Sequence, residues 1–82
     1  MIKVVYFASI REQLERDQEQ LELAPGSSVA TLLTLLRSRG APWDQALGGT
    51  ALLVAVNQEM TNLARVLSPG DEVAFFPPVT GG

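Results

Sequence analysis

The chain has 82 residues, of which 46% are hydrophobic and 18% charged, and its formal net charge is −3. This composition indicates one folded domain that is too apolar for a disordered chain, and the scattered basic residues argue against binding to nucleic acid. The absence of cysteine and histidine excludes disulfides, thiolate nucleophiles, Ser-His-Asp triads and the usual ligands of zinc and haem.

Residues 2–8 are rich in β-branched and aromatic side chains and predict a strand. Alternation along it gives one face with Ile2, Val4, Tyr6 and Ala8 and another with Lys3, Val5 and Phe7. A signal peptide is the alternative interpretation, but the uncharged run is short and leads into charged residues without a clear cleavage site. No stretch is long enough to cross a membrane, so we expect a cytoplasmic protein. Lys3, the only lysine, is expected to be a solvated residue at the edge of the sheet.

Residues 8–16 predict a short helical turn, and residues 17–24 predict a second strand that Pro25-Gly26 stops. The short connection favours antiparallel pairing of the two strands. Carboxylates gather in this region, at Glu12, Glu15, Asp17, Glu19 and Glu22. They lack converging partners for a metal or acid–base site, so we interpret them as a solvated surface.

Residues 27–40 give the clearest helix, with Ser27 or Ser28 able to accept hydrogen bonds from its first amides. Its apolar stripe, with the spacing i, i+3, i+4 and i+7, consists of Val29, Leu32, Leu33 and Leu36. Gly40 supplies a left-handed stop. Residues 41–47 predict a second short helix in which Trp43 packs inward. The Gly48-Gly49 pair ends that helix and lacks the spacing of a phosphate-binding loop.

Residues 52–56 predict a buried strand, residues 57–59 a turn, residues 60–63 a brief extended segment and residues 73–76 the last strand. Pro69-Gly70 marks a turn in which Asp71 can bond its local backbone. These elements predict an α+β domain over residues 1–76, a mixed sheet with one main helix packed on one face. In a β-grasp the first and last strands would lie parallel in the middle of the sheet, a pairing that the pattern alone leaves open.

The last strand alternates Val73 and Phe75 on one face with Ala74 and Phe76 on the other. One long helix covers only one face of a sheet, so Phe76 and Phe7 would lie on the far side, with Met60 as a neighbour. A contiguous exposed apolar patch of this kind is typical of a partner-binding site. The alternative is that loops or the second short helix cover it.

Residues 77–82 predict an extended, flexible C-terminal tail. Pro77 and Pro78 end strand pairing and direct the chain outward, with a reach on the order of 20 Å at about 3.3 Å per residue. Val79 and Thr80 offer side chains to a partner. Gly81 and Gly82 have none, so another protein can close tightly around their backbone and around a terminal carboxylate. An inert, poorly ordered end is the alternative.

The stretches MIKVVYFASIRE, LLVAVNQ and GDEVAFFPPVTGG, together with the chain length, resemble the small subunit of molybdopterin synthase, the MoaD family of ubiquitin-like sulfur carriers. The resemblance implies a β-grasp fold and a reactive Gly82. An E1-like enzyme would use ATP and Mg to adenylate the Gly82 carboxylate, and a sulfur donor protein would convert it to a thiocarboxylate.

The same resemblance implies that the large synthase subunit packs on Phe7, Met60 and Phe76 and receives the tail, in a heterotetramer. There the sulfur would pass to cyclic pyranopterin monophosphate to form molybdopterin. The chain itself would bind no cofactor, no metal and no membrane, and would not be catalytic alone.

Two other functions remain open from the sequence. The chain could be a β-grasp carrier for thiamine or cysteine synthesis, or a modifier joined to lysines, although the Phe-Phe-Pro-Pro stretch and the long helix disfavour the thiamine type. It could also be a non-catalytic interaction module whose tail is inert.

Overall fold

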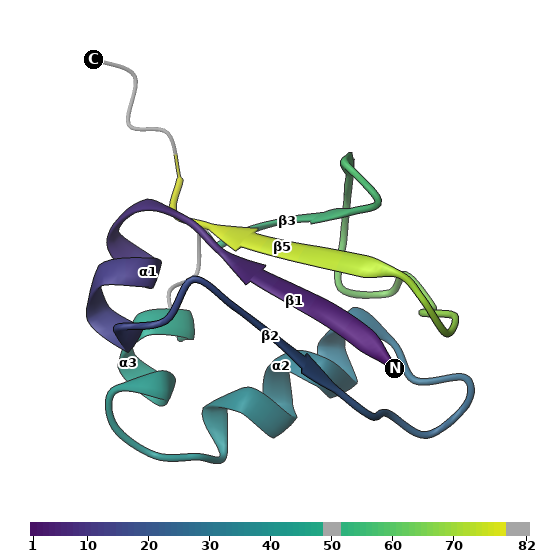
Figure 1. The fold of residues 1–82 in the computed structure, drawn as a ribbon, viewed down its shortest axis with the longest axis horizontal. Coiled ribbons are helices and arrows are strands. Elements are labelled where there is room, and N and C mark those ends of the chain that lie inside the picture. The colour runs from purple at the N-terminus through teal and green to yellow at the C-terminus, as the bar shows by residue number, and fades with distance from the viewer. Residues whose placement is uncertain (49–51, 79–82) are drawn as a thin grey trace.

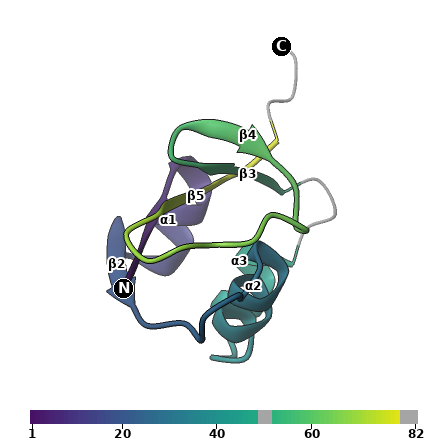
Figure 2. The same cartoon turned by 90° about the vertical axis from the view of Figure 1, so that its right-hand side faces the viewer.

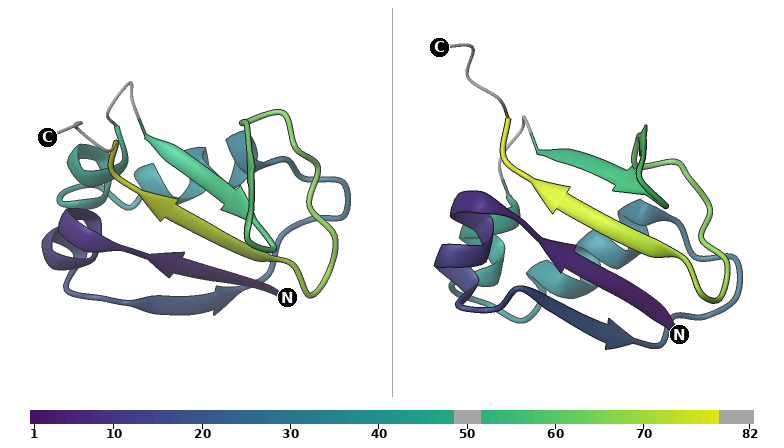
Figure 3. Two further views of the ribbon diagram at one scale, coloured as in Figure 1. Left: turned by 90° about the horizontal axis from the view of Figure 1, so that it is seen from above. Right: turned by 45° about the horizontal axis from the view of Figure 1, so that its top comes forward.

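The computed structural model describes residues 1–48 and 52–78. The elements in those ranges are β1 (Ile2–Tyr6), α1 (Ala8–Leu14), β2 (Gln18–Leu21), α2 (Val29–Arg37), α3 (Trp43–Leu47), β3 (Leu53–Val56), β4 (Glu59–Thr61) and β5 (Glu72–Phe76). The left view of Figure 3 shows α2 running behind the sheet, and Figure 1 shows it below the sheet. In both views α1 and α3 lie at the end of the sheet toward which β1 and β5 point. Within the same ranges, no helix combines the length and the apolar character needed to cross a bilayer.

The sheet has the strand order β2-β1-β5-β3-β4. β1 and β5 run parallel in its middle, with Tyr6 opposite Phe75, and the other neighbouring strands are antiparallel. The predicted antiparallel pairing of the first two strands is confirmed, and so is the parallel central pair. This order, with α2 as the main helix on one face, is the topology expected of a β-grasp.

The first strand is two residues shorter than the sequence pattern predicts. Ala8 does not continue the Tyr6 face, because its backbone is left-handed, with φ 53°, and it begins α1. The early turn lets Ile10 and Leu14 of α1 reach the core, where both are buried. Packing of this helix therefore outweighs the strand propensity of residues 7 and 8.

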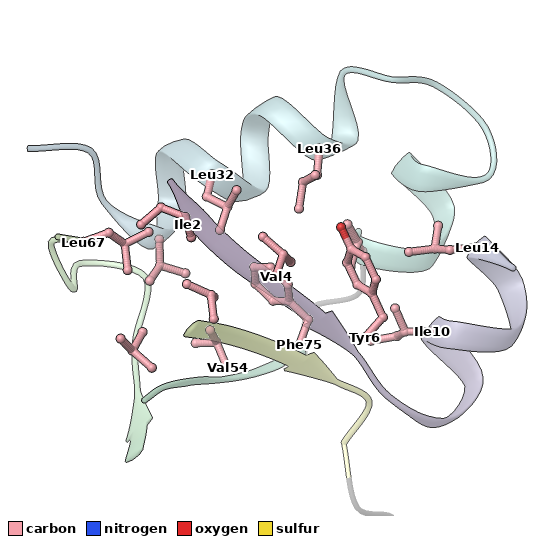
Figure 4. Packing of buried hydrophobic residues seen from close by; sticks show 14 residues of the cluster. Ile2, Val4, Tyr6, Ile10, Leu14, Leu32, Leu36, Val54, Leu67 and Phe75 are labelled. Atoms are coloured by element: carbon pink, nitrogen blue, oxygen red, sulfur yellow. The ribbon is translucent and has the colours of Figure 1, made fainter. Parts of the chain in front are cut away.

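Helix α2 forms as its sequence predicts. Ser28 is the capping residue and its Oγ accepts a hydrogen bond from the Thr31 N–H at 3.2 Å, whereas Ser27 Oγ donates to the Ala24 carbonyl at 2.6 Å. Beyond the helix, Gly40 has the expected positive φ of 85°. The apolar stripe of α2 meets β1, β3 and β5 in the core, as Figure 4 shows for Leu32, Leu36, Val4, Val54 and Phe75.

Two turns at one end of the sheet are joined by side chains. The β3–β4 hairpin turns through Asn57 and Gln58, which have φ values of 51° and 68°. Asn57 Nδ2 donates to Asp71 Oδ1 at 2.9 Å, and Asn57 Oδ1 accepts from the Glu72 N–H at 3.0 Å. Asp71 Oδ2 accepts from the Ser68 N–H at 2.8 Å, which confirms the predicted local bond.

Residues 62–71 run from β4 to β5 past the start of α2 (Figure 2), where Val29 N–H donates to the Arg65 carbonyl at 2.9 Å.

Candidate partner-binding face and start of the C-terminal segment

The sheet face turned away from the helices carries a row of apolar side chains across four strands. The strand register aligns Val5 with Ala74, Ala74 with Ala55, and Ala55 with Met60. Next to this row, Phe76 lies opposite Leu53, and Phe7 follows the end of β1. We call this set the open apolar face; it consists of Val5, Phe7, Leu53, Ala55, Met60, Ala74 and Phe76.

The largest side chains of the open apolar face remain accessible. Phe7 is 46% exposed and Met60 is 60% exposed, so the described loops and helix α3 do not cover them. Phe76 and Leu53 are half-buried, and Ala55 is buried within the sheet. The structure therefore places Phe7, Met60 and Phe76 on one face, as the alternation of residues predicts, with two alanines between Met60 and the aromatic residues.

The Phe7 and Phe76 rings pack edge to face, with centroids 6.3 Å apart and planes at 80°. The backbone holds them together, because the Phe7 N–H donates to the Phe75 carbonyl at 3.2 Å. Pro77 is half-buried and Pro78 is exposed where the chain leaves β5. Residues Val79, Thr80, Gly81 and Gly82 lie outside the described residues, so the predicted roles of these four remain predictions.

Lys3 is not at the edge of the sheet, contrary to the expectation from its sequence. β1 lies between β2 and β5, and Lys3 is opposite Glu72 in the parallel pair. Its Nζ lies 3.7 Å from a Glu72 carboxylate oxygen, and both side chains are partly exposed. Lys3 therefore lies on an interior strand, with the Glu72 carboxylate of the neighbouring strand close to its ammonium group. The two side chains form the polar end of the face that holds Val5 and Ala74.

The interpretation of the acidic stretch as solvated surface is wrong for Glu19. Its side chain is 10% exposed and lies on the helix side of the sheet. It accepts a hydrogen bond from the Tyr6 hydroxyl at 2.8 Å and a bidentate pair from the Arg39 guanidinium at 2.9 Å, and Arg16 lies 3.5 Å away. A tyrosine on a buried face needs a partner for its hydroxyl, so the sequence signals that some polar group lies near Tyr6 but does not identify it as Glu19.

The electrostatics of this cluster follow from its geometry. Burial opposes ionisation of Glu19, but the hydrogen bonds from Arg39 and Tyr6 outweigh it and hold the pKa of Glu19 below its ordinary value. Burial and the adjacent carboxylate raise the pKa of the Tyr6 hydroxyl. The Arg39 guanidinium also lies 4.4 Å from the ring centroid of Trp43, a cation–π contact that joins α3 to the cluster. The predicted inward packing of Trp43 is confirmed in part, since its ring is half-buried beside Tyr6.

Among residues 1–48 and 52–78, no three acidic side chains converge as ligands of a metal ion. The candidate functional site of the described residues is therefore the open apolar face. It lies next to Pro77, where the chain leaves the sheet. An α+β domain with this strand order, this covering helix and this face defines the class of ubiquitin-like β-grasp proteins.

Comparison with known proteins agrees with this class and narrows it. The sequence pattern of the ThiS family matches residues 4–82. The molybdopterin synthase sulfur carrier subunit of Escherichia coli is 43% identical over 82 residues, and the alignment covers all of both chains. The corresponding subunit of Haemophilus influenzae is 42% identical, also over the whole of both chains.

Solved structures share the same fold. A putative molybdopterin converting factor subunit 1 from Pyrococcus furiosus has a TM-score of 0.75 and 31% identity, and covers 95% of this chain and 97% of its own. Small archaeal modifier protein 1 from Haloferax volcanii has a TM-score of 0.79 at 24% identity, covering 99% and 98% of the two chains. A complex of subunits 1 and 2 of the molybdopterin-converting factor from Helicobacter pylori contains a chain with a TM-score of 0.70 at 23% identity, covering 99% and 97%.

The chain therefore belongs to the ThiS family, among the molybdopterin synthase sulfur carrier subunits. The names of these relatives describe them as the sulfur carrier subunits of molybdopterin synthase.

Proposed function

We propose that this chain carries sulfur as a thiocarboxylate on Gly82 and donates it to cyclic pyranopterin monophosphate within a complex with the large subunit of molybdopterin synthase. The observation that carries the proposal is the open apolar face beside Pro77. A partner that packs on Phe7, Met60 and Phe76 lies next to the start of the C-terminal segment. Full-length similarity to two molybdopterin synthase sulfur carrier subunits supports it.

The activation step needs a partner enzyme because a carboxylate is a poor electrophile. Attack of the Gly82 carboxylate on the α-phosphate of ATP, with Mg, forms an acyl adenylate and releases pyrophosphate. Sulfur at the oxidation level of sulfide, delivered as hydrosulfide by a donor protein, then attacks the acyl carbonyl, breaks its bond to AMP and leaves the thiocarboxylate and free AMP. The chain has no cysteine and no histidine, so no thiol of its own competes for the activated carbonyl, and the partners supply the acids and bases. Dependence on ATP and on these partners leads us to place the carrier in the cytoplasm.

In the transfer step, the thiocarboxylate sulfur forms a bond to a carbon of the pterin precursor, and the carbon–oxygen bond at that position breaks, so that the oxygen leaves with a proton. Water then cleaves the bond between that sulfur and the Gly82 carbonyl, which returns the carboxylate for another round. Two rounds supply both sulfur atoms of the dithiolene. We propose that two small and two large subunits form the active heterotetramer.

The activation step can be tested by intact mass. The purified chain is incubated with an E1-like activating enzyme, ATP, Mg and a sulfur donor, and we expect its mass to rise by the difference between one sulfur and one oxygen. Omission of ATP is the control, and deletion of Gly82 should abolish the change. The transfer step is tested by adding the large subunit and the precursor and measuring molybdopterin.

Unchanged sulfur transfer after deletion of Gly82, or after addition of one residue beyond it, would exclude the carrier function. If the thiocarboxylate forms but no molybdopterin appears with the large subunit, the chain is a sulfur carrier for another pathway. Attachment of the chain to lysines of other proteins would instead identify a protein modifier.

A further inference from the structure

Phe7 directly follows β1 and Phe76 is the last residue of β5, and these two strands stop side by side. β1 and β5 are parallel, with Tyr6 opposite Phe75, so the residue after β1 lies beside the last residue of β5. Figure 1 and the right view of Figure 3 show the chain leaving both strands at the same end of the sheet, toward α1 in one case and toward the C-terminus in the other. The hydrogen bond from the Phe7 N–H to the Phe75 carbonyl, at 3.2 Å, lies at this end of the parallel pair.

The contact between the two rings constrains the residue that precedes the prolines. An edge-to-face aromatic pair has a preferred orientation, and the Phe76 ring meets the Phe7 ring at 80° with centroids 6.3 Å apart. Pro77 restricts the backbone of Phe76 to extended conformations and has a fixed φ of its own. The orientation of Phe76 is therefore transmitted to the path of the chain at Pro77 and Pro78.

The backbone on the other side of Phe7 is strained. Ala8 has a φ of 53°, a left-handed conformation that is unfavourable for a residue with a β-carbon. Such strain persists only where the surroundings impose it, and it gathers at functional positions. Here α1 imposes it, because Ile10 and Leu14 are buried in the core and the Arg11 N–H donates to the Phe7 carbonyl at 3.4 Å. The result is a sharp turn that leaves Phe7 over Phe76 while α1 turns toward the core.

We propose that Phe7, held by the left-handed backbone of Ala8, is a positioning residue that sets the direction in which the chain leaves β5 at Pro77. It acts through Phe76 on the path of the C-terminal segment, so its effect is on the rate of sulfur transfer as well as on binding of the partner. This inference rests on the proposed function, because it concerns the approach of Gly82 to the reacting atoms.

The test compares two glycine substitutions at positions with the same backbone strain. Ala8→Gly widens the range of backbone conformations open to residue 8, because glycine has no β-carbon, and Gln58→Gly does the same in the β3–β4 hairpin, where φ is 68°. Each full-length variant is loaded chemically as its thiocarboxylate, so that the activating enzyme plays no part, and mixed with saturating large subunit and precursor. The first-order rate of sulfur transfer, the affinity for the large subunit and the melting temperature are measured.

We expect Ala8→Gly to melt at or above the wild-type temperature and to bind the large subunit within about twofold of wild type, because a positive φ suits glycine and Ala8 contributes only an exposed methyl group. Its transfer rate should fall about tenfold, since the rate depends strongly on placement of the reacting group. Cross-relaxation between the Phe7 and Phe76 ring protons should weaken. Gln58→Gly should keep the wild-type transfer rate.

Phe7→Leu serves as the second variant, since it keeps an apolar side chain but removes the ring edge, and its transfer rate at saturation should also fall. A wild-type transfer rate in either Ala8→Gly or Phe7→Leu overturns the inference, and so does a loss of stability in Ala8→Gly. If the wild-type chain itself transfers no sulfur, the proposed function fails and the inference with it. If the wild-type chain is active and Ala8→Gly matches it, only the inference fails.

Discussion

Glu19 is predicted from the sequence to belong to a solvated surface, but in the structure it contacts Tyr6, Arg39 and Arg16. It joins Tyr6 at the end of β1 to Arg39 beyond α2, and Arg39 in turn lies over Trp43 of α3. A carboxylate with little exposure is stable only when such partners satisfy it. One side chain therefore connects the sheet to both helices that follow it.

The pKa of Glu19 gives the first prediction. Its folded-state pKa lies below the ordinary value of 4.5, so its contribution to stability is complete above about pH 4.5 and is lost as the pH falls through the folded-state value. Glu19→Gln should lower the free energy of unfolding at pH 7 by about 2 kcal/mol, because the Arg39 pair loses its charge. The variant should also show a smaller loss of stability between pH 5 and pH 3 than wild type, in chemical denaturation at each pH.

Glu22→Gln is the matched control, since it makes the same change at an exposed position of the same segment. It should leave both the stability at pH 7 and its pH dependence close to wild type. An equal effect of the two substitutions would show that the Glu19 cluster does not stabilise the fold.

The elements of this fold depend on a few local devices, of which the cap of α2 is the clearest. The sequence offers Ser27 and Ser28 as caps, and the structure assigns the role to Ser28. Ser28→Ala should lower the free energy of unfolding by about 1 kcal/mol, because the Thr31 N–H loses its acceptor. Ser27→Ala, which removes only a donor to the exposed Ala24 carbonyl, should cost less. Urea denaturation of the two variants decides between them, and a larger loss for Ser27→Ala would contradict the assignment.

The β3–β4 hairpin gives a prediction of the opposite sign. Asn57 and Gln58 form a two-residue turn with two positive φ values, a geometry that favours Asn-Gly. Gln58→Gly should raise the free energy of unfolding by about 0.5–1 kcal/mol by removing left-handed strain. Gln58→Ala retains the β-carbon and should give no such gain. A decrease in the melting temperature of Gln58→Gly would contradict this reading of the turn.

Strands and helices with clear periodicity were predictable from the sequence, but their ends and the polar contacts between them were not. Val29, Leu32 and Leu36 define α2 by spacing alone, and the alternation around Phe76 separates the two faces of β5. The end of β1 depends instead on where α1 packs, and the roles of Glu19 and Lys3 depend on residues that lie 20 and 69 positions away along the chain. Such pairings exist only once the fold has brought the segments together.

At the scale of the whole molecule, exposed apolar side chains are distributed over more than one surface. Met60 is 60% exposed on the open apolar face, and Val66 is 56% exposed on the connection between β4 and β5. Exposure alone therefore does not distinguish a partner-binding face, and the two residues form a matched pair for testing which surface is used.

Met60→Glu should weaken binding of the large synthase subunit about tenfold or more, because a charge would be buried in an apolar contact. Val66→Glu should leave the affinity within about twofold of wild type. Both side chains are exposed, so neither change should shift the melting temperature appreciably. Calorimetry with the large subunit provides the measurement, and stronger weakening by Val66→Glu would place the partner on the other surface.

The central position of β5 has a consequence for how the chain folds. Among the strands that the structure describes, only β5 links β2-β1 to β3-β4, and its neighbour β1 lies about 70 residues earlier in the sequence. Without β5 the sheet is not shortened but divided into two ribbons of two strands, and such ribbons are marginal in water. Long-range pairing of this kind makes folding slow compared with local hairpins. Because β5 also contributes Ala74 and Phe76, the open apolar face does not exist in a partly folded chain. Under the proposed function, a partner would therefore recognise only molecules that have completed the sheet.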